Sequence, residues 1–163
     1  MDRRVFLISI CLTLVTACAK TLPDNYSGPT AVVRDTHANY VEGGFFRDEK
    51  VDLFVMQTMD GKLIDNGQLA TARASFKSSL GFALKPSSFE RPVPIRPMTV
   101  GLAAIVVYAA GGQYGGSREP QTMATRKLKF NPVAGETYVV RGTITRDTSS
   151  VWLETASGQM VSE

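Results

Sequence analysis

Short β-prone segments separated by turn residues run through most of this chain, and they constrain its fold more than any other feature. The segments are rich in Val, Thr, Tyr and Phe, and no long stretch has the apolar spacing of an amphipathic helix. We therefore expect an all-β domain. The predicted strands are Thr30–Asp35, Val51–Met59, Lys62–Asp65, Arg91–Pro97, Thr99–Ala109, Met123–Phe130, Thr137–Arg146, Val151–Thr155 and Gln159–Val161.

Two pairs of these strands are joined by connections that suit tight hairpin turns. Asp60-Gly61 separates the second and third strands, and Ser157-Gly158 separates the last two. Asp-Gly is a strong hairpin signal, because both central residues of the favoured turn have a positive φ. Arg91–Pro97 contains three prolines, which cannot donate ladder hydrogen bonds, so we expect an edge strand or an extended connector there.

Alternation along two strands indicates that one face of each is buried and the other is solvated. In Thr137–Arg146, Tyr138 and Val140 share a face, while Arg141 and Thr143 lie on the other. In Met123–Phe130, one face carries Thr125, Lys127 and Lys129, which point to water. This pattern predicts two antiparallel sheets packed as a β-sandwich.

The stretch Phe130–Val140, with the sequence FNPVAGETYVV, supports the same fold by resemblance. It resembles the turn and following strand of transthyretin-like and immunoglobulin-like sandwiches, where a Gly turn precedes a Tyr at a strand start. The resemblance covers these residues alone. It implies a fold and no activity, because such sandwiches host many unrelated functions.

The predicted strand Thr99–Ala109 is apolar on both faces, which is unusual for a sandwich strand. Val106 and its even-numbered neighbours form one face, and Ile105 and Val107 lie on the other. Something must cover this second face. The favoured explanation is that the segment Asn66–Phe89 folds over it, and the alternative is a protein partner that binds Ile105 and Val107.

The N-terminus has the layout of an export signal: Arg3 and Arg4, the apolar run Val5–Val15, then small residues up to Cys18. A spanning helix needs about 20 apolar residues, so this run is too short to be a permanent transmembrane anchor. Val15-Thr16-Ala17-Cys18 resembles the lipobox of bacterial lipoproteins, and the chain also resembles uncharacterised proteobacterial lipoproteins of its size. The lipobox resemblance implies cleavage before Cys18 and lipidation of its sulfur.

A lipidated Cys18 divides the chain into three parts and implies a location. Residues 1–17 would be the signal peptide, 18–28 the lipidated cysteine with a flexible tether, and 29–163 a single β-sandwich domain. Ala19 follows the cysteine where an aspartate would favour inner-membrane retention, so the resemblance implies the periplasmic side of the outer membrane. Arg3-Arg4 is compatible with the general secretory route, which we favour, and with the twin-arginine route.

Charge and cysteine content limit the partners of the mature chain. Removing residues 1–17 takes out Arg3, Arg4 and Asp2, which leaves 16 basic and 14 acidic residues and a formal charge of +2. This small excess does not favour a nucleic-acid partner, which would need clustered basic residues. Cys11 lies in the signal peptide and Cys18 would carry lipid, so no disulfide is expected.

No motif in the sequence predicts catalysis, a metal site or a cofactor. His37 is the one histidine, and no nucleophile stands with it and Asp35, so we expect a surface histidine. The glycine-rich stretch Gly111–Ser117 lacks the lysine of a phosphate-binding loop and is predicted to be a flexible connection. Its Tyr114 is a candidate contact residue for a partner or a glycan. We expect a solvated loop surface for the basic residues Arg73, Lys77, Lys85, Arg91 and Arg96.

The sequence thus predicts a lipid-anchored, non-catalytic binding or assembly module of the cell envelope. Its partners would be the membrane, through the lipid, and an envelope protein. A lipoprotein that binds a small ligand or a glycan is the alternative, and an envelope enzyme without a recognisable motif is a third class.

Overall fold

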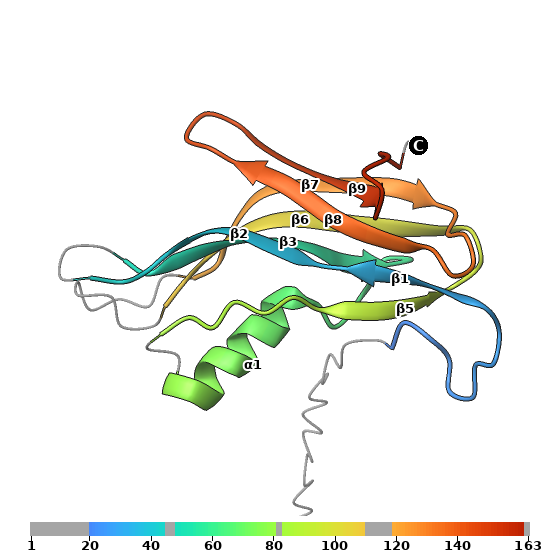
Figure 1. Cartoon of the computed structure of the whole chain (residues 1–163), viewed down its shortest axis with the longest axis horizontal. Helices are drawn as coiled ribbons and strands as arrows, with labels where there is room; N and C mark the ends of the chain where they lie inside the picture. Colours follow the sequence, from blue (N-terminus) through green and yellow to red (C-terminus); the bar gives the residue numbers. More distant parts are fainter. Residues whose placement is uncertain (1–19, 45–47, 81–82, 110–118, 162–163) are drawn as a thin grey trace, which may run out of the picture.

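The protein is a β-sandwich of two sheets, with one helix against the outer face of the second sheet (Figure 1). This computed structural model describes residues 20–44, 48–80, 83–109 and 119–161. In spatial order, the first sheet contains β5 (Glu90–Pro94), β1 (Thr30–Arg34), β8 (Thr137–Ile144) and β9 (Ser149–Thr155). The second contains β2 (Thr36–Val41), β3 (Lys50–Met59), β6 (Met98–Tyr108) and β7 (Gln121–Phe130), with β4 (Lys62–Leu63) paired to β3.

The main core lies between the two sheets, as the alternation in the sequence predicted. From the second sheet it receives one face of β3 and β6, including Phe54 and Leu102. From the first sheet it receives Val33, Val140 and Leu153, all fully buried. The predicted all-β sandwich is therefore confirmed, and its pairings are antiparallel except that β1 runs parallel to β8.

Both predicted hairpin turns are present. Asp60 and Gly61 have φ values of 51° and 78°, the positive angles that a two-residue turn between β3 and β4 requires. At the second turn Gly158 has a φ of 88°, and Thr155 N–H donates to the Gln159 carbonyl at 2.9 Å. The chain after this turn makes one bridge, Glu154 to Met160, in place of the predicted strand Gln159–Val161.

The turn before β8 is closed by the tyrosine that carried the sandwich resemblance. The Tyr138 hydroxyl accepts a hydrogen bond from Val133 N–H at 3.0 Å, and Gly135 adopts a φ of 76°. The rings of Phe130 and Tyr138 meet edge to face, with centroids 4.7 Å apart. These contacts join the end of β7 to the start of β8.

The segment Asn66–Phe89, expected to be irregular, contains the helix α1 (Gly67–Ser79). Asn66 caps this helix by accepting hydrogen bonds from Gln68 N–H and Leu69 N–H. The segment covers the second apolar face of the sheet, as we expected. Leu84 packs against a buried cluster that comprises Val51, Leu53, Val55, Ala103 and Ile105.

This cover removes Ile105 from the candidate interaction residues. Its side chain is 1% exposed, so it offers no surface to a partner in this fold. Val107 is half-buried and packs against the same cluster. The proposed protein interface on this face of β6 is therefore corrected: the chain itself occupies it.

Candidate functional site

Among the described residues, the other residues that the sequence singled out are not brought together. Cys18 and Tyr114 lie outside the described residues. His37 is exposed on β2, whereas Asp35 is 1% exposed and bonded inside the fold. The two side chains are therefore not an acid–base pair, and His37 is the surface histidine that the sequence predicted.

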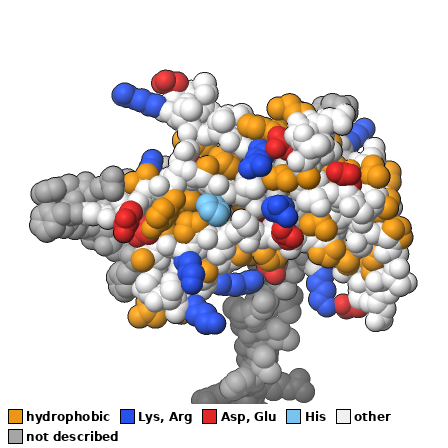
Figure 2. Space-filling view, in the orientation of Figure 1, with side chains coloured by type: hydrophobic (Ala, Val, Ile, Leu, Met, Phe, Trp, Pro, Cys, Tyr) orange, Lys and Arg blue, Asp and Glu red, His pale blue; other side chains and the backbone are white. Residues whose placement is uncertain are grey.

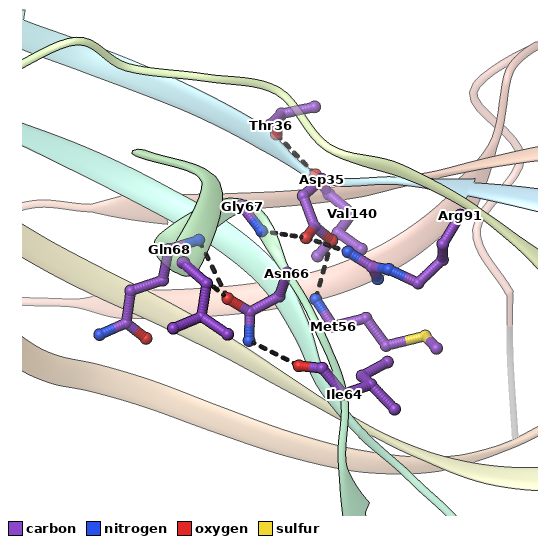
Figure 3. A network of polar contacts seen from close by, with 10 residues as sticks. Asp35, Thr36, Met56, Ile64, Asn66, Gly67, Gln68, Arg91 and Val140 are labelled. Atoms are coloured by element: carbon purple, nitrogen blue, oxygen red, sulfur yellow. Dashed lines mark hydrogen bonds and ion pairs between the residues drawn. The ribbon is translucent and has the colours of Figure 1, made fainter. Parts of the chain in front are cut away.

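Asp35 instead forms a buried ion pair with Arg91, which corrects the expected surface position of that arginine (Figure 3). The Asp35 carboxylate also accepts hydrogen bonds from Met56 N–H at 2.9 Å and Gly67 N–H at 2.7 Å. Burial raises the pKa of the Asp35 carboxyl, and the charge of Arg91 opposes this shift. Because these bonds join β1, β3, β5 and α1, the pair is structural.

A polar site arises elsewhere, near the bulges of two edge strands of the second sheet. On β2 the register with β3 shifts between Ala38 and Val41, and on β7 the partner of β6 changes from Ala124 to Thr122. A bulge re-aims the side chains that follow it and often lies beside a functional site. Here Asn39 and Met123 lie at the two bulges, and both line the same pocket.

The result is a pocket of about 470 Å³ at the open end of the sandwich, which we call the loop-end pocket. All four main strands of the second sheet contribute to it, and the end of β8 closes one side. Val41, Val106, Met123 and Ile144 form its apolar part. Its polar lining residues are Asn39, Lys50, Asp52, Tyr108, Gln121, Thr145 and Arg146.

Asp52 is the central polar group of the loop-end pocket. Its side chain is 3% exposed, and its carboxylate accepts a hydrogen bond from Asn39 Nδ2 at 2.7 Å. Asn39 has a φ of 50°, a left-handed conformation that costs energy in most residues and is tolerated by asparagine. Asn39 thus has an uncommon backbone conformation, and its side-chain amide donates to the buried carboxylate of Asp52.

Two cations share the pocket with this carboxylate. Lys50 precedes Asp52 by two residues on the same face of β3, and Arg146 follows β8. The polar lining therefore supplies charged donors, neutral amides and one anionic acceptor within a small volume. This set can bind a ligand through several hydrogen bonds.

Two residues that line the loop-end pocket come from the facing ends of neighbouring strands. They are Tyr108, the last residue of β6, and Gln121, the first residue of β7. Tyr114, the contact residue proposed from the sequence, lies between them in the chain and outside the described residues.

A larger hollow, about 720 Å³, lies between residues 20–26 and the turns after β3 and β5. One of its walls is the segment that precedes β1. The charges of Asp60 and Arg96 in its lining are paired with each other at 2.6 Å. We favour the loop-end pocket as the ligand site because its buried carboxylate is positioned by the sheet itself.

Sequence reasoning missed the loop-end pocket because its members are far apart in the chain. One local signal was available, since Asp52 interrupts the apolar run of Val51–Met56. A buried charge in such a strand needs compensation and often marks a site. The bulges that gather the other groups depend on strand pairing, which the sequence pattern alone did not reveal.

Neither a metal centre nor a membrane-spanning helix is found among the described residues. There, no three His, Cys, Asp or Glu side chains are grouped so that they could hold a metal ion. Within the same ranges, no helix is long and apolar enough to cross a bilayer.

Comparison with known proteins identifies no relative of this chain. No protein-family model, curated protein or solved structure matches it.

Proposed function

We propose that this chain is a lipid-anchored, non-catalytic binding protein of the cell envelope, and that the loop-end pocket binds a polar, hydroxyl-rich ligand such as a saccharide. The lipobox-like sequence ending at Cys18 supports the anchor, and Ala19 supports the periplasmic side of the outer membrane. The buried Asp52 with its Asn39 partner is the observation that carries the binding role.

The chemistry of the pocket favours a saccharide over an apolar ligand. Sugar hydroxyls donate to carboxylates and accept from amide, ammonium and guanidinium groups, which Asp52, Asn39, Lys50 and Arg146 provide. The C–H faces of a sugar ring suit the apolar lining around Val106 and Ile144. A saccharide ligand develops the alternative that the sequence offered, a lipoprotein that binds a small ligand or a glycan. The burial of Ile105 weakens the assembly role that the sequence favoured.

An array of bacterial envelope saccharides tests this function with the full-length lipoprotein in detergent. Asp52→Asn keeps the shape of the side chain and removes its charge. Loss of a charged hydrogen bond costs about 1.5–3 kcal/mol, so we expect binding to weaken roughly tenfold to a hundredfold. Asp24→Asn is the matched control, because Asp24 is exposed and lines the hollow formed by residues 20–26.

Two results would contradict the proposal. One is an array on which the wild-type protein binds no saccharide. The other is a bound saccharide whose affinity is the same for wild type and Asp52→Asn, since the ligand would then occupy another surface.

A further inference from the structure

The helix α1 packs with its small polar residues inward and leaves large apolar residues in solvent. Gly67, Thr71 and Ser75 are its buried positions, while Phe76 and the C-cap residue Leu80 are each 65% exposed. This is the reverse of the usual amphipathic arrangement on a globular protein. The exposed side chains therefore require an explanation that the packing of the domain does not supply.

Hydrogen bonds explain the inward face. Thr71 Oγ1 accepts from Ser87 N–H at 3.1 Å, and Ser75 Oγ accepts from Lys85 N–H at 2.8 Å. These bonds fasten the returning segment that leads to β5. At Gly67 an added Cβ would lie 3.2 Å from Asp35 Cβ, a tight contact that favours a residue without a side chain at the helix start.

The outward face carries apolar side chains on either side of Arg73. At about 100° per residue, the half-buried Leu69 and the exposed Phe76 project to one side of the helix, and the C-cap residue Leu80 is exposed at its end. The buried positions Thr71 and Ser75 lie on the opposite side. We call Leu69, Phe76 and Leu80 the outer stripe.

Basic residues lie next to the outer stripe. Arg73 and Lys77 are exposed on the helix, and Lys85 is exposed in the segment that follows it. Asp65 pairs with Arg73 at 3.3 Å and offsets one of these charges. Figure 2 shows hydrophobic and basic side chains together at the lower left, over the position of α1 in Figure 1. Exposed apolar side chains beside Lys and Arg are one feature of helices that lie in the interface of an anionic membrane, although α1 is only weakly amphipathic.

The start of the described chain lies close to the N-terminal end of α1. Thr21 and Leu22 are half-buried and line a hollow of about 300 Å³ together with Asp65, which directly precedes the cap residue Asn66. Cys18 stands two residues before Lys20, a reach of at most about 7 Å. A lipid on Cys18 would therefore hold this end of α1 near the bilayer.

We propose that the outer stripe of α1 lies in the headgroup region of the membrane that holds the lipid on Cys18, with Lys77 and Lys85 against anionic phosphates. This proposal rests on the anchoring in the proposed function. The chain then meets the bilayer at two places, the lipid and the helix, and has a fixed orientation. The β8–β9 hairpin, at the top of Figure 1, faces away from α1 and hence away from the lipid surface.

Fluorescent labels in the lipidated protein test this contact. No cysteine follows Cys18, so Phe76→Cys and Leu80→Cys each supply a single free thiol for an environment-sensitive dye. The labelled proteins are reconstituted into vesicles of phosphatidylethanolamine and phosphatidylglycerol that contain lipids with brominated acyl chains. We expect both dyes to shift to shorter wavelength and to be quenched by the bromines. Met160→Cys is the control: Met160 is 61% exposed after β9, and its dye should show neither change.

Flotation of the same vesicles separates the two proposals. In one outcome the protein floats with the vesicles, but the dyes at positions 76 and 80 behave like the control dye. This outcome overturns the helix contact and leaves the anchor intact. Protein that does not float overturns the anchor and this inference with it. In another outcome the dyes are not quenched in vesicles and shift to shorter wavelength only in native envelopes. This outcome shows a protein partner on the outer stripe and also overturns the proposal.

Charge reversal provides a second, independent measurement. The double variant Lys77→Glu, Lys85→Glu should lose quenching of the dye at position 76 in vesicles with phosphatidylglycerol. Quenching unchanged by this variant contradicts the role assigned to the two lysines.

Discussion

A single carboxylate, that of Asp35, holds three parts of the fold together. It binds the backbone of β3 at Met56, the start of α1 at Gly67 and the guanidinium of Arg91 on β5. Nε and Nη1 of Arg91 are buried and have no hydrogen-bond partner among the described residues, although the guanidinium lies over the Phe89 ring, 5.2 Å from its centroid. The arginine therefore depends on this one carboxylate for its charge compensation.

Asp35→Ala should destabilise the protein strongly. It leaves the charge of Arg91 buried and uncompensated, and breaking a buried pair in this way costs about 3–5 kcal/mol. We expect a large loss in the free energy of unfolding, measured by chemical denaturation with Trp152 fluorescence. Arg34→Gln removes the exposed ion pair with Glu90 and should cost at most about 1 kcal/mol. Equal effects of the two substitutions would contradict a special role for the buried pair.

At the scale of the element, the sequence predicted strands well where apolar residues alternate and poorly where they do not. β8 was predicted within a few residues because its apolar residues alternate, and β3 and β6 were predicted because their β-branched, apolar runs are bounded by turn residues. β2 was missed because Thr36–Val41 is an edge strand without a fully buried residue. The helix was missed because small polar residues face inward, so its buried side has no apolar period. The cap residue Asn66 and the spacing of Leu69, Phe76 and Leu80 were the signals available for it.

The cover of β6 by the segment around α1 can be tested with Ile105→Asp. The substitution places an unpaired charge in the cluster of Val51, Leu53 and Ala103, at a cost of several kcal/mol. We expect the cooperative thermal transition, followed by circular dichroism, to be lost or strongly lowered. Val133→Asp is the control, since Val133 is 62% exposed and should tolerate the same change. A melting temperature for Ile105→Asp close to that of wild type would mean that this face is open in solution.

At the scale of the whole molecule, local sequence patterns predicted some features and missed others. The sandwich, the edge position of β5 and the exposed His37 followed from the sequence, because each depends on its own neighbourhood. The Asp35–Arg91 pair and the loop-end pocket did not, because their members are joined only by folding: Asp35 and Arg91 are 56 residues apart. In the proposed function the loop-end pocket is the ligand-binding end, and in the further inference the outer stripe of α1 is the membrane-facing side.

This arrangement depends on the lipid proposed at Cys18, and two matched substitutions test it in intact cells. Cys18→Ala removes the sulfur that would receive the lipid, so the precursor should stay uncleaved and should not incorporate a fatty-acid analogue. Cys11→Ala removes the other cysteine of the chain, within the predicted signal peptide, and should leave cleavage and labelling unchanged. Cleavage is read from the shift in electrophoretic mobility, and labelling from gel fluorescence after attachment of a dye to the analogue.

Membrane retention is a further readout. The lipobox resemblance implies a diacylglyceryl group on Cys18, and two acyl chains give stable anchoring, so wild-type protein should remain in the membrane fraction after a salt wash. Labelling that survives Cys18→Ala would show lipid at another position, and the orientation inferred from the distance between Cys18 and α1 would then be lost.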